Sequence, residues 1–102
     1  LGSVGDPRRG GRLSEISQAV RIDNRRGLHA RASAKFVSLA SSLAAQIEVA
    51  KDGNKVCGTS IMGLMMLGAA KGDTIEISAR GDGAHDALQQ LVTLVEERFG
   101  ED

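Results

Sequence analysis

The chain has 102 residues, of which 41% are hydrophobic and 25% charged, so it suits one compact domain and argues against a disordered protein. Thirteen basic and thirteen acidic residues cancel, which argues against a nucleic-acid partner, because general nucleic-acid binders carry a basic excess. One cysteine cannot form an internal disulfide and no apolar stretch is long enough for membrane insertion, so we expect a cytoplasmic protein.

The first part of the chain differs from the rest. Residues 1–13 are rich in glycine and arginine and show no hydrophobic period, and Gly2-Ser3 is typical of a vector-encoded extension. We expect a flexible N-terminal tail over residues 1–13. The folded domain is predicted to occupy residues 14–102.

The domain is predicted to begin with a strand and a helix. At every second position from Ile16 to Ile22, three of four residues are apolar, which indicates a strand. The polar and glycine-containing segment 23–27 is typical of a turn. Apolar residues then recur at spacings of three and four, which predicts a helix over residues 30–41.

The remaining elements follow from similar patterns. Alternation around Ile47 and Val49, followed by an Asp-Gly pair, predicts a hairpin whose second strand covers residues 55–58. A short helix over 61–67 and a strand over 74–79 come next. A final amphipathic helix is predicted from Ala84 to Phe99.

The predicted order is therefore β-α-β-β-α-β-α. One hairpin and no regular alternation of strands with helices favour an α+β fold, with a four-stranded antiparallel sheet and three helices on one face. Free Cys is commonly buried, so we expect Cys57 inside a strand. Leu64 and Leu67 are expected in the core.

Candidate chemistry concentrates in the segment Gly27-Leu28-His29-Ala30-Arg31. Free N–H groups at a helix N-terminus favour anions, phosphate in particular, and Arg31 could add a guanidinium fork. Neutral imidazole is a competent nucleophile toward phosphorus, and nearby arginines should favour that neutral form of His29. The alternative is that His29 only caps the helix.

Two segments together resemble a known family. Gly-Leu-His-Ala-Arg at 27–31, followed by Ala-Ser-Ala-Lys-Phe-Val, is similar to the active-site segment of the HPr family, the histidine-containing phosphocarriers of the bacterial phosphoenolpyruvate phosphotransferase system. Residues 58–72 resemble the regulatory-serine helix of the same family. The resemblance runs from about Ile16 to Phe99 and implies an open-faced β-sandwich. It departs from the family at Ala32, where proline is usual.

The resemblance implies roles for individual residues. His29 matches the histidine that is phosphorylated on Nδ1, and Arg31 matches the arginine that attends the phosphoryl group. Ser60 matches the serine that a dedicated kinase phosphorylates in some bacteria, whereas spacing alone makes it an ordinary helix N-cap. The positions expected to dock partner proteins are Ala30, Ala34, Ile61, Met62 and Met65.

The implied function is a covalent relay rather than an enzyme. Phosphorylated enzyme I would load His29, and an enzyme IIA-type protein would accept the phosphoryl group in sugar uptake or its regulation. Two alternatives remain open: a regulatory phosphocarrier of a nitrogen-type phosphotransferase system, and a non-catalytic α+β binding module. We expect a monomer with no cofactor. We also expect no metal, because the two histidines and Cys57 match no zinc spacing. His85 is expected at the surface.

Overall fold

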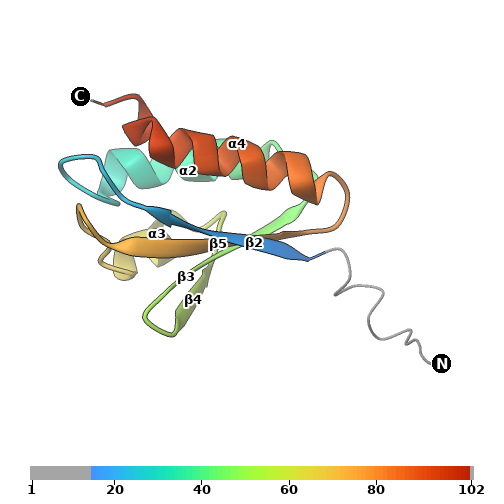
Figure 1. Cartoon of the computed structure of the whole chain (residues 1–102), viewed down its shortest axis with the longest axis horizontal. Coiled ribbons are helices and arrows are strands. Elements are labelled where there is room, and N and C mark those ends of the chain that lie inside the picture. Colours follow the sequence, from blue (N-terminus) through green and yellow to red (C-terminus); the bar gives the residue numbers. More distant parts are fainter. Residues whose placement is uncertain (1–14, 102) are drawn as a thin grey trace.

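Strands and helices follow one another in the predicted order in a computed structural model that describes residues 15–101 (Figure 1). The strands are β2 (Ile16–Arg21), β3 (Gln46–Lys51), β4 (Asn54–Cys57) and β5 (Thr74–Arg80). The helices are α2 (Ala30–Ser41), α3 (Ile61–Met66) and α4 (Ala84–Glu96), followed by the 3₁₀ turn η1 (Arg98–Gly100). The tail predicted over residues 1–13 lies outside the described residues.

The four strands form one antiparallel sheet in the order β2-β5-β3-β4. The alternating apolar residues of the two central strands face one side, where Val49 lies opposite Ile77 and both are fully buried. The polar residues between them point to the other side. The predicted antiparallel sheet is therefore confirmed.

The helices cover one face of this sheet and enclose the core. α4 packs on β2 and β5, and α2 packs between α4 and α3 (Figure 1). Phe36, Leu64 and Leu91 are buried where these elements meet, and Leu67 joins them as predicted. The predicted α+β architecture is confirmed. Within residues 15–101, every helix is too short or too polar to cross a lipid bilayer.

The loop after β2 and the loop after α3 are joined by backbone hydrogen bonds at the end of the molecule where α2 begins. The Leu28 N–H donates to the Ala69 carbonyl over 2.9 Å, and the Gly72 N–H donates to the Ile22 carbonyl over 2.7 Å. Gly27 has φ +66°, and a Cβ added there would overlap the Ala69 carbonyl oxygen. Only glycine fits this position, for both reasons.

The predicted last helix ends three residues early. α4 stops at Glu96, and Phe99 adopts a left-handed conformation (φ +56°) in the turn that follows, with its ring buried. The Lys35 ammonium holds this turn by donating to the Phe99 carbonyl over 2.7 Å. The apolar spacing that extended the predicted helix to Phe99 reflects its buried ring. It could not show that a turn, rather than a longer helix, brings the ring into the core.

The prediction for Cys57 was wrong, because its side chain is exposed. β4 lies at the edge of the sheet, and its residues are largely open to solvent. The Cys57 Sγ lies 3.0 Å from the Thr59 hydroxyl oxygen. Hydrogen bonding to Thr59, mainly to this hydroxyl and also to the backbone, lowers the pKa of the Cys57 thiol below its ordinary value. Sequence pattern alone does not reveal which strand becomes an edge.

Replacing Gly27 by alanine should lower the free energy of unfolding by about 2–4 kcal/mol, because left-handed strain adds to the overlap with Ala69. Gly68→Ala is the matched control: its φ of +65° is almost identical, but nothing lies within 4 Å of the added Cβ. Gly68→Ala should lower the free energy of unfolding by only about 1 kcal/mol. Urea denaturation of both variants measures the difference. Equal losses would show that the close approach to Ala69 contributes nothing.

Candidate functional site

The turn after β2 places His29 at the N-terminus of α2, as its N-cap residue. The His29 carbonyl accepts the first helical hydrogen bond, from the Ser33 N–H over 2.8 Å. Its ring nitrogen Nδ1 accepts from the Arg31 backbone N–H over 3.3 Å. The imidazole is thus anchored with Nδ1 directed at the start of the helix, where unpaired amides favour anions.

The other ring nitrogen meets a carboxylate from the far end of the chain. His29 Nε2 lies 3.0 Å from one oxygen of Glu101 and 3.2 Å from the other. Because Nδ1 accepts a hydrogen bond, the proton of the neutral ring resides on Nε2, which donates to Glu101. This tautomer leaves the lone pair on Nδ1, the nitrogen that a phosphoryl group would need.

The Glu101 carboxylate is stabilised in its charged form. The hydrogen bond from His29 is the main cause that holds the pKa of Glu101 below its ordinary value, assisted by a hydrogen bond from Asn24 and by the charge of Lys35. Both side chains of the pair are largely covered, with 21% of His29 and 16% of Glu101 exposed. The pair is therefore ordered yet open to a partner.

Three arginines lie beside the Glu101 side of this pair. Arg25, Arg26 and Arg31 line, together with Glu101, a hollow of about 350 Å³. Guanidinium groups and a helix N-terminus both attract a phosphoryl group, so the start of α2 and the adjoining arginines form a cationic region next to the pair. The cationic surroundings expected for His29 are present, but a carboxylate that the sequence did not predict is its nearest charged neighbour.

Ser60 is the N-cap residue of α3, where its hydroxyl oxygen accepts from the Gly63 N–H over 3.0 Å. The apolar side chains that follow it are exposed. Ile61 and Met65 are each 40% exposed, and Met62 and Met66 are 68% and 79% exposed.

These residues lie at the same end of the molecule as His29. α3 packs against α2, and the loop after α3 binds the turn that carries His29 (Figure 1). Ala30 and Ala34 are exposed on α2. We call the surface of Ala30, Ala34, Ile61, Met62 and Met65 the docking face, after the role expected for these positions from the sequence.

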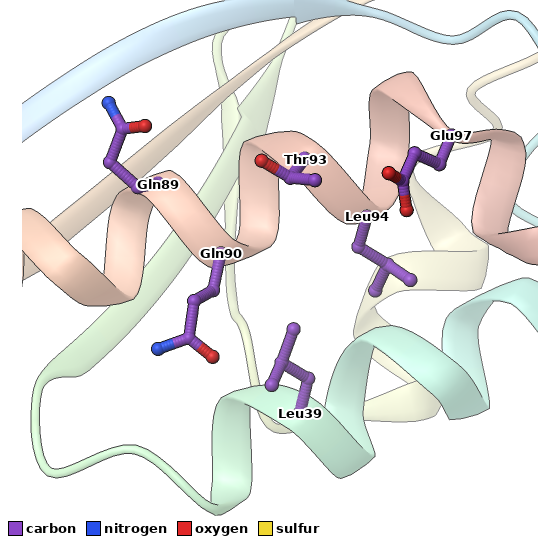
Figure 2. Close-up of a pocket in the computed structure, with 6 residues that line it drawn as sticks. All are labelled: Leu39, Gln89, Gln90, Thr93, Leu94 and Glu97. Carbon is purple, nitrogen blue, oxygen red and sulfur yellow. The ribbon is translucent and has the colours of Figure 1, made fainter.

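Another hollow of about 360 Å³ opens between α2 and α4 (Figure 2). Leu39 faces Leu94 across it, and Gln90 and Thr93 lie beside them. Leu39 is ten residues beyond His29, about 15 Å along α2. This hollow is therefore separate from the His29 site.

The other candidate ligands and nucleophiles are scattered. His85 is exposed at the start of α4, as predicted. Within residues 15–101, His, Cys, Asp and Glu side chains form no group of three that could bind a metal ion.

Sequence reasoning missed two residues of the site. Glu101 is 72 positions from His29, and Asn24 was treated only as part of a turn. Asn24 is in fact fully buried beneath the site. Neither position carries a local signal, because the contact depends on how the last turn of the chain folds back.

The contact between Glu101 and His29 predicts how Glu101 titrates. Its pKa should lie below the ordinary 4.5, and His29→Ala should raise it, because the main hydrogen bond is lost. A lowered pKa in the folded state stabilises the fold above pH 4.5, and this stabilisation is lost as the pH falls through the lowered pKa. A carbon-13 NMR titration of the Glu101 carboxyl measures the shift. The same titration midpoint in both proteins would contradict the contact.

Comparison with known proteins places the chain in a family. The family described as PTS HPr component phosphorylation site matches residues 16–97. Phosphocarrier protein HPr of Neisseria meningitidis serogroup A is 45% identical over 86 residues, which cover 84% of this chain and 97% of that protein. Phosphocarrier protein NPr of Shewanella violacea is 36% identical over 89 residues, 87% and 98% of the two chains. The crystal structure of HPr-C-His from Thermoanaerobacter tengcongensis matches with a TM-score of 0.82 at 45% identity, over 85% and 98%. The chain therefore belongs to the HPr family of phosphocarriers of the phosphotransferase system.

Proposed function

We propose that this phosphocarrier takes a phosphoryl group on His29 Nδ1 from phosphorylated enzyme I and passes it to an enzyme IIA-type acceptor in sugar uptake or its regulation. The observation that carries the proposal is the state of the imidazole. Glu101 engages Nε2 over 3.0 Å, while the lone pair of Nδ1 faces the start of α2. The ring is thus already in the tautomer and orientation that transfer to Nδ1 requires.

Transfer to His29 exchanges one bond to phosphorus for another. The bond between phosphorus and the donor group of enzyme I breaks, and that group keeps the electron pair, while the Nδ1 lone pair forms the new bond. The His29 ring retains its Nε2 proton and so gains positive charge. The Glu101 carboxylate, 3.0 Å from Nε2, stabilises that charge, as the carboxylate of a catalytic triad does for its histidine.

The groups around Nδ1 are suited to hold the transferred phosphoryl oxygens. The Arg31 N–H that Nδ1 binds before transfer becomes free to donate to one oxygen, and the Arg31 guanidinium can reach another. Arg25 and Arg26 line the same hollow and add positive charge. These contacts need no reorganisation of α2, because the donors are already at its N-terminus.

The docking face would receive each partner in turn. Its exposed methionines are flexible and polarisable, which suits a surface that must fit more than one protein. Its position beside His29 lets one surface serve both enzyme I and the enzyme IIA-type acceptor.

Ser60 is the proposed regulatory position, with an HPr serine kinase as the partner that would modify it. Its backbone precedes the exposed helix α3, so a phosphate there would lie next to Ile61 and Met62. A phosphoserine adds roughly −1.5 to −2 charges, and these would repel an acidic partner from the docking face. The hydroxyl now serves as an N-cap, a role that a phosphate can also fill.

A second candidate is a regulatory relay of the nitrogen type. The observation that favours it is the 36% identity to the NPr of Shewanella violacea. The chemistry at His29 would be the same, and only the acceptor would differ. For either relay we propose a cytoplasmic protein. We propose that it is a monomer, because one copy of the chain both buries the core and completes the pair of His29 and Glu101. A binding module without phosphorylation would leave the ordered tautomer of His29 without a use.

Incubating the protein with phosphoenolpyruvate and enzyme I should give a singly phosphorylated, acid-labile adduct. His29→Ala should give none. Arg31→Ala should slow loading about tenfold to a hundredfold, because a cationic donor to the phosphoryl oxygens is lost. Mass spectrometry at neutral pH measures the adduct and its rate of formation.

Arg80→Ala is the control for this experiment, since Arg80 is exposed and binds Gln46 away from the site. Loading at the wild-type rate is expected for it. An adduct that persists in His29→Ala would overturn the assignment of the phosphorylated residue. No adduct on the wild-type chain, with enzyme I active on another HPr, would overturn the proposed function itself.

Ser60→Asp should weaken binding to enzyme I about tenfold, because a carboxylate then faces the partner. Aspartate is itself a favoured N-cap residue, so α3 should persist. Isothermal calorimetry measures the affinity, and Gln89→Glu is the control that adds one charge on α4, away from the docking face. Equal affinity for Ser60→Asp and the wild type would remove Ser60 from the interface.

A further inference from the structure

We propose that Asn24 is a positioning residue of the phosphoryl relay: it holds Glu101 in place, so that Glu101 fixes the His29 ring with Nδ1 free to react. This inference rests on the proposed function for its kinetic consequence. Its structural part stands on the contacts of Asn24 alone. The hydrogen bonds of Asn24 go to Gly27 and Glu101, so it would act on the ring through Glu101.

Asn24 joins the turn before α2 to the end of the chain. Its side-chain amide Nδ2 donates to the Gly27 carbonyl over 2.8 Å and to Glu101 Oε1 over 3.3 Å. The same carboxylate accepts from His29 Nε2. Asn24 thus fixes both the turn that carries His29 and the group that holds the ring.

The orientation of the Asn24 amide is determined by its partners. A flipped amide would direct Oδ1 at two acceptors, the Gly27 carbonyl and the Glu101 carboxylate, so Nδ2 must face them. Oδ1 is buried with no hydrogen-bond partner among the described residues. A buried acceptor without a partner is costly, and this cost offsets part of what the two donated hydrogen bonds contribute to stability. The amide is the side chain that supplies two donors here without adding charge beside Glu101.

The rest of the Glu101 surroundings explains why a second anchor is needed. Two left-handed residues, Arg98 and Phe99, precede it, with φ +58° and +56°. The Lys35 ammonium holds this strained turn by donating to the Phe99 carbonyl, and not by a hydrogen bond to the Glu101 carboxylate. Asn24 and His29 supply the hydrogen bonds between Glu101 and the core of the site.

The first experiment measures the tautomer of His29 without any partner protein. Nitrogen-15 NMR of the wild-type chain at a pH where the ring is neutral should show the proton on Nε2. In Asn24→Ala the two ring nitrogens should move toward each other, as the tautomers mix. Asn54→Ala, which alters an exposed asparagine at the β3–β4 hairpin, should leave both signals unchanged. A wild-type tautomer in folded Asn24→Ala would overturn the proposal.

The second experiment separates positioning from stability. Asn24→Ala should slow loading by enzyme I about three- to tenfold, as for the loss of one hydrogen bond. In a Glu101→Gln background the same change should have no further effect on the rate, because the group it positions is already altered. Asn24→Ala also removes the hydrogen bond to the Gly27 carbonyl. The resulting loss of thermal stability should therefore appear both in the wild-type background and in the Glu101→Gln background.

The outcomes are distinct. Rate losses that add across the two substitutions would show that Asn24 acts through the turn alone, and would overturn the proposal. If Asn24→Ala fails to fold, Asn24→Asp replaces it: the carboxylate repels Glu101 and should mix the tautomers more strongly. Failure of enzyme I to load the wild-type chain would refute the proposed function, while the nitrogen-15 result would still decide whether Asn24 orders the ring.

Discussion

The site depends on a backbone contact between two loops that are more than forty residues apart. The Ala69 carbonyl accepts the Leu28 N–H, and its approach to Gly27 leaves no room for a side chain. This contact fixes the backbone just before α2 begins. Since His29 follows Leu28 directly, the same contact helps to set its backbone position, together with the hydrogen bond from Asn24 to the Gly27 carbonyl.

The ring itself is oriented by the opposite end of the chain. α4 stops early, and the left-handed turn that follows carries Glu101 back to His29. Left-handed residues other than glycine cost about 1 kcal/mol or more each, and such strain persists only when the surroundings enforce it. Here the buried Phe99 ring and the bond from Lys35 do so. The fold thus combines a rigid start of α2 with a separately anchored carboxylate.

Much of the fold could be predicted from the sequence, because it depends on local periodicity. The alternation in β5 and the spacing of α2 are strong signals, and both elements have the expected limits within a residue or two. The segment around His29 could be located because glycine, histidine and arginine stand side by side. Glu101 and Asn24 could not, since their roles arise from a tertiary contact across 77 positions. The exposure of Cys57 was missed for a related reason, because the order of strands in a sheet is not a local property.

In the proposed relay, the use of histidine as a helix cap links the fold to the chemistry. Before transfer, Nδ1 itself accepts the Arg31 N–H, so this amide has a partner while the site is empty. After transfer, a phosphoryl oxygen can take the place of Nδ1 as the acceptor. The 3.3 Å separation is long for a hydrogen bond, so little is lost when the nitrogen gives it up. In the proposed relay the Arg31 N–H therefore has an acceptor in both states, so neither uptake nor release of the phosphoryl group leaves this amide without a partner.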